Sequence, residues 1–177
     1  MKVAICGVQG TGKTTKVFEI AKELKYKNKD KKVGIVQENA IDCPYPINEN
    51  TISLSQYWLV CDQVKKELEY SKKYDIVICD RTIFDPICYC YAASVINEIK
   101  IEKDVLETTA KILYDFTKNL GYTYDKIYLM NGNNNFYNYS DGIRSVNLEF
   151  RNIVNNYFLD VFYDLYSDGY IKDYEII

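Results

Sequence analysis

The sequence predicts an α/β fold in which a five-stranded parallel sheet lies between layers of helices. Short apolar runs alternate along the chain with longer stretches in which apolar residues recur at helical spacing. The apolar runs are continuous, as in strands that are buried on both faces of a parallel sheet. The 177 residues suffice for one domain, and no linker or internal repeat divides them. We therefore expect residues 1–177 to form a single domain.

The first strand and helix form the clearest pair. Residues 2–6 make a short apolar run, Lys-Val-Ala-Ile-Cys, that ends in a glycine-rich turn. Residues 13–27 then carry apolar side chains on one helical face, which comprises Val17, Ile20, Ala21 and Leu24. The order strand, glycine-rich loop, helix is therefore predicted for the start of the chain.

Two further strands and one long helix are expected next. Residues 32–37 predict a second strand, and residues 51–70 predict a helix with apolar residues at Leu54, Trp58, Cys61, Val64 and Leu68. Residues 74–79 predict a third strand. Its apolar middle is uninterrupted, which indicates a position inside the sheet.

The second half of the chain continues the alternation. The expected elements are helices at 85–99 and 104–120, a strand at 126–130, a helix at 145–166 and a strand at 170–176. Asp104 and Glu107 resemble a capping box, and Gly121 follows the helix that they would open. The polar, asparagine-rich segment 131–141 is expected to be a loop.

Composition restricts the possible chemistry. The chain contains no histidine, which excludes Ser-His-Asp and Cys-His catalysis, histidine metal ligands and a histidine pH switch. A formal net charge of −3 and a pI near 5.1 argue against a polynucleotide partner. The six cysteines form no C-x-x-C pair, and neither a secretory signal nor a long apolar segment is present. We expect a reduced, soluble, cytoplasmic protein that does not enter a membrane.

The strongest motif is Gly-Val-Gln-Gly-Thr-Gly-Lys-Thr, which begins at Gly7 and matches G-x-x-x-x-G-K-[ST] between a predicted strand and a predicted helix. Its backbone N–H groups can surround a phosphate, and the helix N-terminus adds partial positive charge. Lys13 can reach the β- and γ-phosphates, and the Thr14 hydroxyl can bind Mg²⁺. The motif predicts a three-layer P-loop NTPase fold that binds ATP and Mg²⁺. The expected nucleotide-binding residues are Gly7, Gly10, Thr11, Gly12, Lys13, Thr14 and Thr15.

Asp80 and Arg81 come directly after the third predicted strand. A carboxylate in this place is a typical second partner for magnesium, so we expect Asp80 to join Thr14 in the metal site. The alternative role for Asp80 is that of an aspartate in a turn or at a helix cap. Arg81 offers a planar, permanently charged group that suits a phosphoryl oxygen or a carboxylate, and its alternative is a structural salt bridge.

The phosphate loop and the Asp80-Arg81 pair resemble the nucleoside and nucleotide kinases of the P-loop class, which include thymidylate kinases and deoxynucleoside kinases. The chain more closely resembles the small AAA-type ATPase/kinase family that includes ribosylnicotinamide kinase domains. This likeness rests on Glu38, Cys43 to Asn48, Thr51, Gln56, Trp58, Asp80, Arg81, Asp85, Tyr89, Asp141, Gly142, Arg144, Ser145, Phe150 and Arg151. The family often has an arginine between the glutamate and the Cys-Pro pair, where this chain has Asn-Ala-Ile-Asp.

The resemblance implies an acceptor site near the phosphate loop. Glu38 follows the second strand, and a carboxylate in this place orients or deprotonates the acceptor hydroxyl in similar kinases. Asp85 is the competing base, although Pro86 follows it and a helix N-cap role is equally well supported. Trp58 and Tyr89 are candidates to stack on the acceptor, with packing as the alternative for both.

The remaining two arginines predict a lid. Arg144 and Arg151 are seven residues apart, so in a helix they lie about 20° apart and roughly 10 Å along the axis. We expect a small lid at residues 131–151, in which these arginines close over the ATP phosphates while Arg81 serves the acceptor. The alternative to this lid is that Arg144 and Arg151 are simply solvent-facing residues of a helix.

The sequence thus predicts an ATP- and Mg²⁺-dependent kinase of a small nucleoside-like or nucleotide acceptor. The competing hypothesis is a nucleotide-binding ATPase or switch protein without such an acceptor. A polynucleotide end is a third acceptor, against which the acidic pI counts. The sequence does not distinguish ATP from GTP, and it predicts no oligomeric state.

Overall fold

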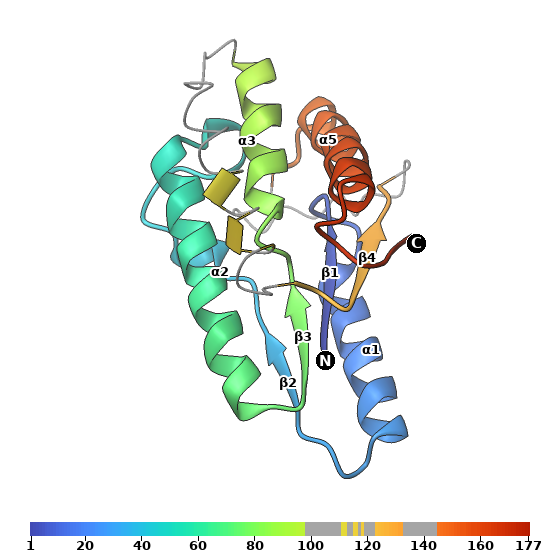
Figure 1. Cartoon of the computed structure of the whole chain (residues 1–177). Coiled ribbons are helices and arrows are strands. Elements are labelled where there is room, and N and C mark those ends of the chain that lie inside the picture. The colour runs from blue at the N-terminus through green and yellow to red at the C-terminus, as the bar shows by residue number, and fades with distance from the viewer. Residues whose placement is uncertain (98–110, 113–114, 117, 119–122, 133–144) are drawn as a thin grey trace.

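The computed structural model describes residues 1–97, 111–112, 115–116, 118, 123–132 and 145–177 (Figure 1). Its centre is a five-stranded sheet with the order β2-β3-β1-β4-β5. Every neighbouring pair is parallel, which confirms the predicted fold class. The strands are β1 (Lys2–Gly7), β2 (Val33–Val36), β3 (Ile76–Asp80), β4 (Lys126–Met130) and β5 (Tyr174–Ile176).

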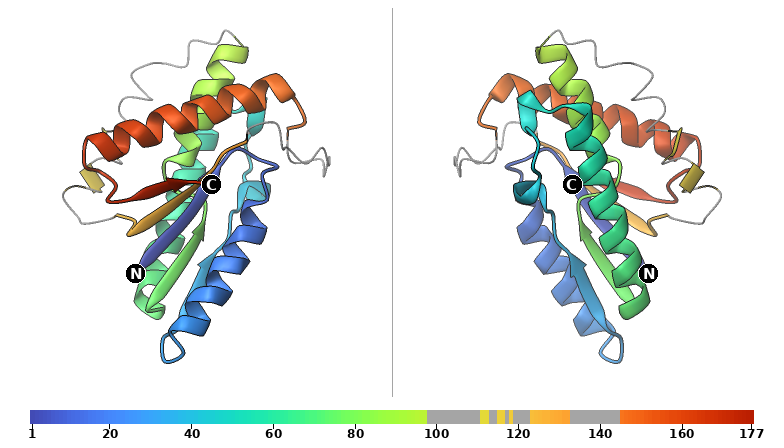
Figure 2. Two further views of the ribbon diagram at one scale, coloured as in Figure 1. Left: turned by 90° about the vertical axis from the view of Figure 1, so that its right-hand side faces the viewer. Right: turned by 90° about the vertical axis from the view of Figure 1, so that its left-hand side faces the viewer.

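Helices cover both faces of this sheet, as predicted. They are α1 (Lys13–Lys27), α2 (Ser53–Lys73), α3 (Asp85–Ile96) and α5 (Leu148–Ser167), with short 3-10 helices η1 (Ala40–Asp42) and η2 (Asn48–Asn50). Helix α1 lies on one face, and α2, α3 and α5 lie on the other (Figure 2). Residues of β1 alternate accordingly: Val3 and Ile5 pack with α1, whereas Ala4 and Cys6 join the larger core on the opposite face.

Most predicted elements are confirmed, with shifted ends. The helix at 13–27 and the strand at 126–130 have the predicted bounds, and β3 is an interior strand with every residue buried. The predicted helix at 145–166 begins later, because Asn147 caps it by accepting a hydrogen bond from the Phe150 N–H at 3.1 Å. The last strand is shorter because the N–H groups of Tyr170 and Ile171 donate back to the Leu165 carbonyl at the end of α5.

Three predictions fall wholly or largely outside the described residues. They are the capping pair Asp104 and Glu107, most of the helix at 104–120 with Gly121, and the loop from residue 133 onward. The two 3-10 helices were not predicted, because residues 38–50 carry no apolar periodicity. Among the described residues, no helix is long and apolar enough to cross a membrane.

The parallel topology places the phosphate loop and Asp80 at the same edge of the sheet. β1 is the central strand, with β3 on one side and β4 on the other, and Ile5 is aligned with Asp80 and Gly7 with Met130. The phosphate loop and Asp80 therefore leave the same carboxyl edge, where ligands of open α/β sheets bind.

Candidate active site

Glycines shape the loop between β1 and α1. Gly7, Gly10 and Gly12 have φ angles of 123°, 81° and 85°, in a region that residues with a side chain avoid. A Cβ on Gly7 would lie 2.5 Å from the carbonyl oxygen of Met130, so β1 and β4 also require glycine here. The backbone therefore forms the tight loop before a helix N-terminus that the sequence motif predicts.

This loop lines a cavity of about 430 Å³. Its lining consists of Gln9, Gly10, Thr11, Gly12, Lys13, Thr14, Thr15, Lys16, Glu19, Glu38, Arg81 and Met130. All the predicted nucleotide-binding residues except Gly7 are in this lining, and Gly7 lies at the start of the loop. The lining is rich in backbone amides and small polar side chains, which suits a phosphate chain.

Lys13 is buried beneath the loop, and its Nζ donates a hydrogen bond to the carbonyl oxygen of Val8 at 2.6 Å. Thr11 also donates to this oxygen, at 3.0 Å. Burial lowers the pKa of Lys13 to about 7, and the positive charge of Arg81 acts in the same direction. An anionic ligand near Nζ would favour the charged form, so the loop is suited to bind phosphate.

Thr14 and Asp80 meet between β1 and β3. The Thr14 hydroxyl donates to Asp80 Oδ2 at 2.8 Å, and Asp80 Oδ1 is buried without a hydrogen-bond partner among the described residues. Mg²⁺ binds oxygen ligands at about 2.0–2.1 Å in octahedral geometry, which places neighbouring ligand oxygens roughly 3 Å apart. The two oxygens therefore fit a magnesium ion whose other ligands are phosphate oxygens and water.

Arg81 has the most unusual backbone of the site. Its φ is 94°, and its side chain is largely buried. One terminal nitrogen, Nη1, donates to the carbonyl of Gly7 at 2.6 Å and to the hydroxyl of Tyr89 at 3.2 Å. Nε lies 3.0 Å from Glu38 Oε1, and Nη1 lies 3.3 Å from Asp85 Oδ2. Burial opposes the charged guanidinium, but Glu38 and the other acidic neighbours raise its pKa above the ordinary value.

Asp85 is committed to the turn that precedes α3. Its Oδ1 accepts hydrogen bonds from the Thr82 N–H at 2.8 Å and the Thr82 hydroxyl at 2.6 Å, and its Oδ2 faces Arg81. Burial raises the pKa of Asp85 to about 6 although Arg81 opposes this shift. Both carboxylate oxygens have protein partners, but none is a backbone N–H of α3, so Asp85 holds the preceding turn and does not form the predicted helix N-cap. Glu38, in contrast, keeps a third of its side chain exposed.

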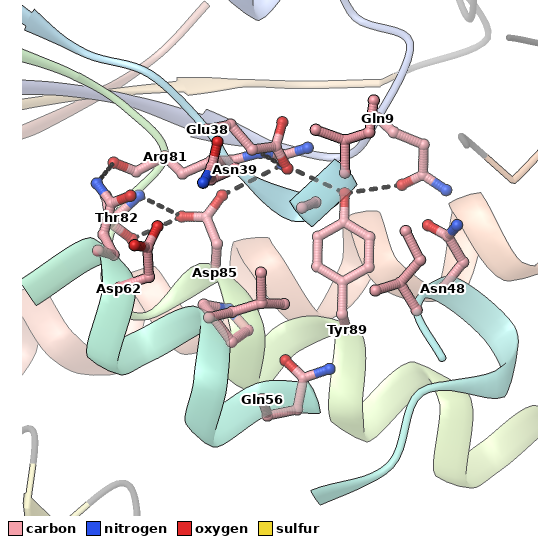
Figure 3. A pocket seen from close by; sticks show the side chains of 16 residues that line it. Gln9, Glu38, Asn39, Asn48, Gln56, Asp62, Arg81, Thr82, Asp85 and Tyr89 are labelled. Carbon is pink, nitrogen blue, oxygen red and sulfur yellow. Dashed lines mark hydrogen bonds and ion pairs between the residues drawn. The ribbon is translucent and has the colours of Figure 1, made fainter. Parts of the chain in front are cut away.

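A second cavity of about 290 Å³ adjoins the first. It is lined by Gln9, Glu38, Asn39, Ala40, Ile41, Ile47, Asn48, Gln56, Leu59, Asp62, Gln63, Arg81, Thr82, Asp85, Pro86 and Tyr89 (Figure 3). Four of the five predicted acceptor residues, Glu38, Arg81, Asp85 and Tyr89, are in this lining. Gln9, Glu38 and Arg81 line both cavities.

Tyr89 connects Arg81 to the phosphate loop. Its hydroxyl accepts from Arg81 and donates to Gln9 Oε1 at 2.8 Å, and the guanidinium lies 5.5 Å from the centre of its ring. Burial raises the pKa of Tyr89 well above its ordinary range, so the hydroxyl keeps its proton. The Tyr89 ring packs on Phe150 and Phe158, and only part of it faces the cavity.

Besides Gly7 and Asp80, two predicted residues that the structure describes, Trp58 and Arg151, are not among those that line the two cavities. Trp58 lies on α2 near lining residues, but it is not part of the lining. Arg151 is buried in α5, where its Nε donates to the carbonyl of Ser145 at 2.7 Å. It is therefore not a solvent-facing helix residue. Arg144, together with positions 133–143 of the expected lid, falls outside the described residues.

Sequence reasoning assigned no role to several lining residues. Gln9 occupies a variable position of the phosphate-loop motif, so the motif gives no reason to select it. Gln56 belongs to the resembling segment, but a single polar residue in an amphipathic helix has no distinctive pattern. Asn39 and Asn48 approach the cavity through the two 3-10 helices, which the sequence did not predict.

No family model matches the sequence, and no curated protein matches it. Solved structures do match. Deoxyadenosine kinase from M. mycoides with bound dATP is 20% identical, with a TM-score of 0.67 over 99% of this chain and 90% of that chain. The same enzyme with bound dCTP is 18% identical, with a TM-score of 0.68 over 98% and 89%.

A thymidylate kinase from Ehrlichia chaffeensis is also similar. It is 18% identical, with a TM-score of 0.63 over 100% of this chain and 86% of that chain. These similarities span nearly the whole of each chain, although so few residues are shared. Together with the sheet order and the phosphate loop, they show that this protein has the fold of the P-loop nucleoside and nucleotide kinases.

Proposed function

We propose that the protein is an ATP- and Mg²⁺-dependent kinase that transfers the γ-phosphoryl group to a hydroxyl of a small nucleoside. The observation that carries this proposal is the pair of adjoining cavities. One is lined by the phosphate loop, the other by mixed polar and apolar side chains, and they share Gln9, Glu38 and Arg81. A donor and an acceptor can therefore meet at these residues.

The charges of the second cavity favour a nucleoside over a nucleoside monophosphate. Its described lining contains three carboxylates, Glu38, Asp62 and Asp85, but only Arg81 as a cation. Arg81 already contacts Glu38 and Asp85. A monophosphate acceptor would bring negative charge to a surface where carboxylates predominate, whereas a neutral hydroxyl compound would not.

Uncharged amides could bind the base or sugar of such an acceptor. Asn39, Asn48 and Gln56 all line the cavity. Gln56 donates to the Thr51 hydroxyl, while its buried Oε1 has no hydrogen-bond partner among the described residues. A hydrogen-bond donor on a ligand in this cavity would pair with that oxygen. Leaving a buried acceptor without a hydrogen bond costs free energy.

The proposed chemistry is a direct transfer. The acceptor hydroxyl oxygen attacks the γ-phosphorus, the bond to the β-phosphate oxygen breaks, and the hydroxyl proton passes to Glu38. The products are the phosphorylated acceptor, ADP and a proton that Glu38 later releases. Lys13 and the loop amides bind the phosphates, and Arg81 holds Glu38 in place, so positioning and charge neutralisation provide most of the catalysis.

Thr14 and Asp80 would hold the Mg²⁺, which neutralises charge on the β- and γ-phosphates when bound. The roles of Trp58 in stacking and of Arg144 and Arg151 in a lid stay predictions, as does the finer likeness to ribosylnicotinamide kinase domains. The burial of Arg151 requires α5 or its start to move if this side chain is to reach the phosphates.

Acceptor-dependent release of ADP tests the proposal. The protein is incubated with MgATP and, separately, with nucleosides, nicotinamide riboside and nucleoside monophosphates. We expect ADP release with a nucleoside and none with the monophosphates. Release without any acceptor would favour the ATPase or switch hypothesis instead. Lys13→Ala should abolish turnover, because it removes the cation beneath the phosphate loop.

A further inference from the structure

The backbone of Arg81 adopts a conformation that residues with a side chain avoid. Its φ of 94° brings the Cβ close to the backbone, which costs free energy. Such a conformation persists only where surrounding contacts hold it. Because the Arg81 side chain lines both cavities, the geometry of this peptide determines where its guanidinium lies.

The peptide groups around Arg81 are held by hydrogen bonds from distant parts of the chain. The Arg81 N–H donates to the carbonyl of Ile5 at 2.9 Å. The Arg81 carbonyl accepts from Gln63 Nε2 of α2 at 3.3 Å. The Ile83 N–H donates to the hydroxyl of Tyr124, just before β4, at 3.0 Å. Two side chains therefore fix the turn from outside it.

Both of these side chains converge on one buried carboxylate. Gln63 Nε2 donates to Glu67 Oε1 at 2.9 Å, and the Tyr124 hydroxyl donates to the same oxygen at 2.8 Å. Glu67 is fully buried, and its Oε2 forms an ion pair with Lys2 Nζ at 3.0 Å. Glu67 thus connects the first residues of β1 to the turn after β3.

The carboxylate sets the direction of both hydrogen bonds. A tyrosine hydroxyl has a single hydrogen, and here it is given to Glu67, so the hydroxyl oxygen is left to accept from the Ile83 N–H. The amide nitrogen of Gln63 has two hydrogens, one for Glu67 and one for the Arg81 carbonyl. An ionised carboxylate can only accept, so neither neighbour can reverse its role.

Stability alone does not account for this arrangement. A buried ion pair loses its hydration, and well-packed apolar residues often stabilise a core as much or more. We propose that Glu67, through Gln63 and Tyr124, is a positioning residue that holds Arg81 in its left-handed conformation and so aligns its guanidinium with Glu38. This inference rests on the proposed kinase function.

Tyr124→Phe tests the inference with the smallest change. It removes the acceptor for the Ile83 N–H but keeps the buried ring. We expect kcat to fall about tenfold because the reacting groups are misaligned. The KM for ATP should change less than kcat, because Lys13, whose Nζ donates to the Val8 carbonyl, has no contact with Tyr124. Glu67→Gln should act in the same direction, because an amide can donate towards Tyr124 or Gln63.

Ile171→Val is the matched control for stability. Ile171 is buried and lies outside both cavities, so this substitution weakens the core without touching the turn. Melting temperatures are measured for both variants, and kcat should fall only in Tyr124→Phe. An equal fall in kcat at equal loss of stability would overturn the positioning role.

A double-mutant comparison tests whether the effect passes through Arg81. In an Arg81→Lys background, Tyr124→Phe should lower kcat no further, because the group that it positions is gone. The same fold loss in both backgrounds would overturn the proposal.

A crystal structure of Tyr124→Phe separates this inference from the proposed function. We expect Arg81 to leave the left-handed region or its guanidinium to move away from Glu38, whether or not the wild type phosphorylates any compound. An unchanged Arg81 would overturn the inference. Absence of acceptor-dependent ADP release from the wild type would instead contradict the kinase function.

Discussion

The hydroxyl of Thr14 donates to Asp80 Oδ2 at 2.8 Å, and so joins the first turn of α1 to the end of β3. If these oxygens hold the metal ion, Asp80→Asn should lower Mg²⁺-dependent turnover by about a hundredfold, because a neutral amide is a poor ligand for Mg²⁺. Turnover is measured over a range of Mg²⁺ concentrations. Asp173→Asn, at the opposite edge of the sheet and half exposed, is the control that should behave as wild type.

Nucleotide binding should be coupled to proton uptake at Lys13. Burial lowers the pKa of Lys13 to about 7 in the free protein, with Arg81 adding to the shift while Glu38, Asp80 and Asp85 oppose it. Phosphate beside Nζ favours the charged form and raises this pKa, so ATP affinity should fall as pH rises above about 7.

Calorimetry in buffers with different ionisation enthalpies measures this proton uptake directly. Lys13→Arg should remove the pH dependence, because arginine stays charged throughout this range. An ATP affinity that is the same at about pH 6.5 and about pH 8.5 would contradict the assignment of Lys13.

Gly7→Ala should destabilise the protein by about 2 kcal/mol or more, through backbone strain and contact with β4. The added Cβ would lie 2.5 Å from the Met130 carbonyl oxygen at a φ of +123°. Gly169→Ala is the matched control. Gly169 also has a positive φ, +76°, but nothing lies within 4 Å of its Cβ position. That change should cost only about 1 kcal/mol of strain. Urea denaturation compares the two, and equal losses would argue against the close approach.

Glu38→Gln should lower kcat by about a hundredfold without weakening ATP binding, because the amide cannot take the acceptor proton. Asp62→Asn provides a control within the same cavity, since Asp62 pairs with Lys66 on α2 at 2.7 Å. Steady-state kinetics with a saturating acceptor distinguish the two. If both variants lose turnover equally, general charge and not a specific base at Glu38 is responsible.

The sequence predicts the donor side of the site far better than the acceptor side. The phosphate loop is a local motif whose spacing follows from backbone chemistry, and Asp80 follows because parallel strands end at one edge. The proposed acceptor cavity is assembled from α2, α3 and two 3-10 helices, and the 3-10 helices have no apolar periodicity. Asn48 therefore gave no signal of its own, whereas Gln56 lies on the predicted helix α2, where a single polar residue is not distinctive.

Long-range contacts account for the remaining differences. Nothing local indicates that Arg81 has a positive φ, because Glu67 and Tyr124 contribute to its turn from far along the chain. The spacing of Arg144 and Arg151 predicts a shared helix face but not the surroundings of that face. Arg151 turned out to be buried, which only the packing of α5 could decide.

The charges at the carboxyl edge bear on which form of ATP the proposed kinase would bind. Among the described residues around the phosphate loop and the end of β3, four carboxylates, Glu19, Glu38, Asp80 and Asp85, face three cations, Lys13, Lys16 and Arg81. Bare ATP carries its full negative charge into a region that is already slightly negative, whereas the magnesium complex brings its own counter-ion. If the protein binds ATP as proposed, these charges should therefore favour nucleotide that arrives with its metal ion.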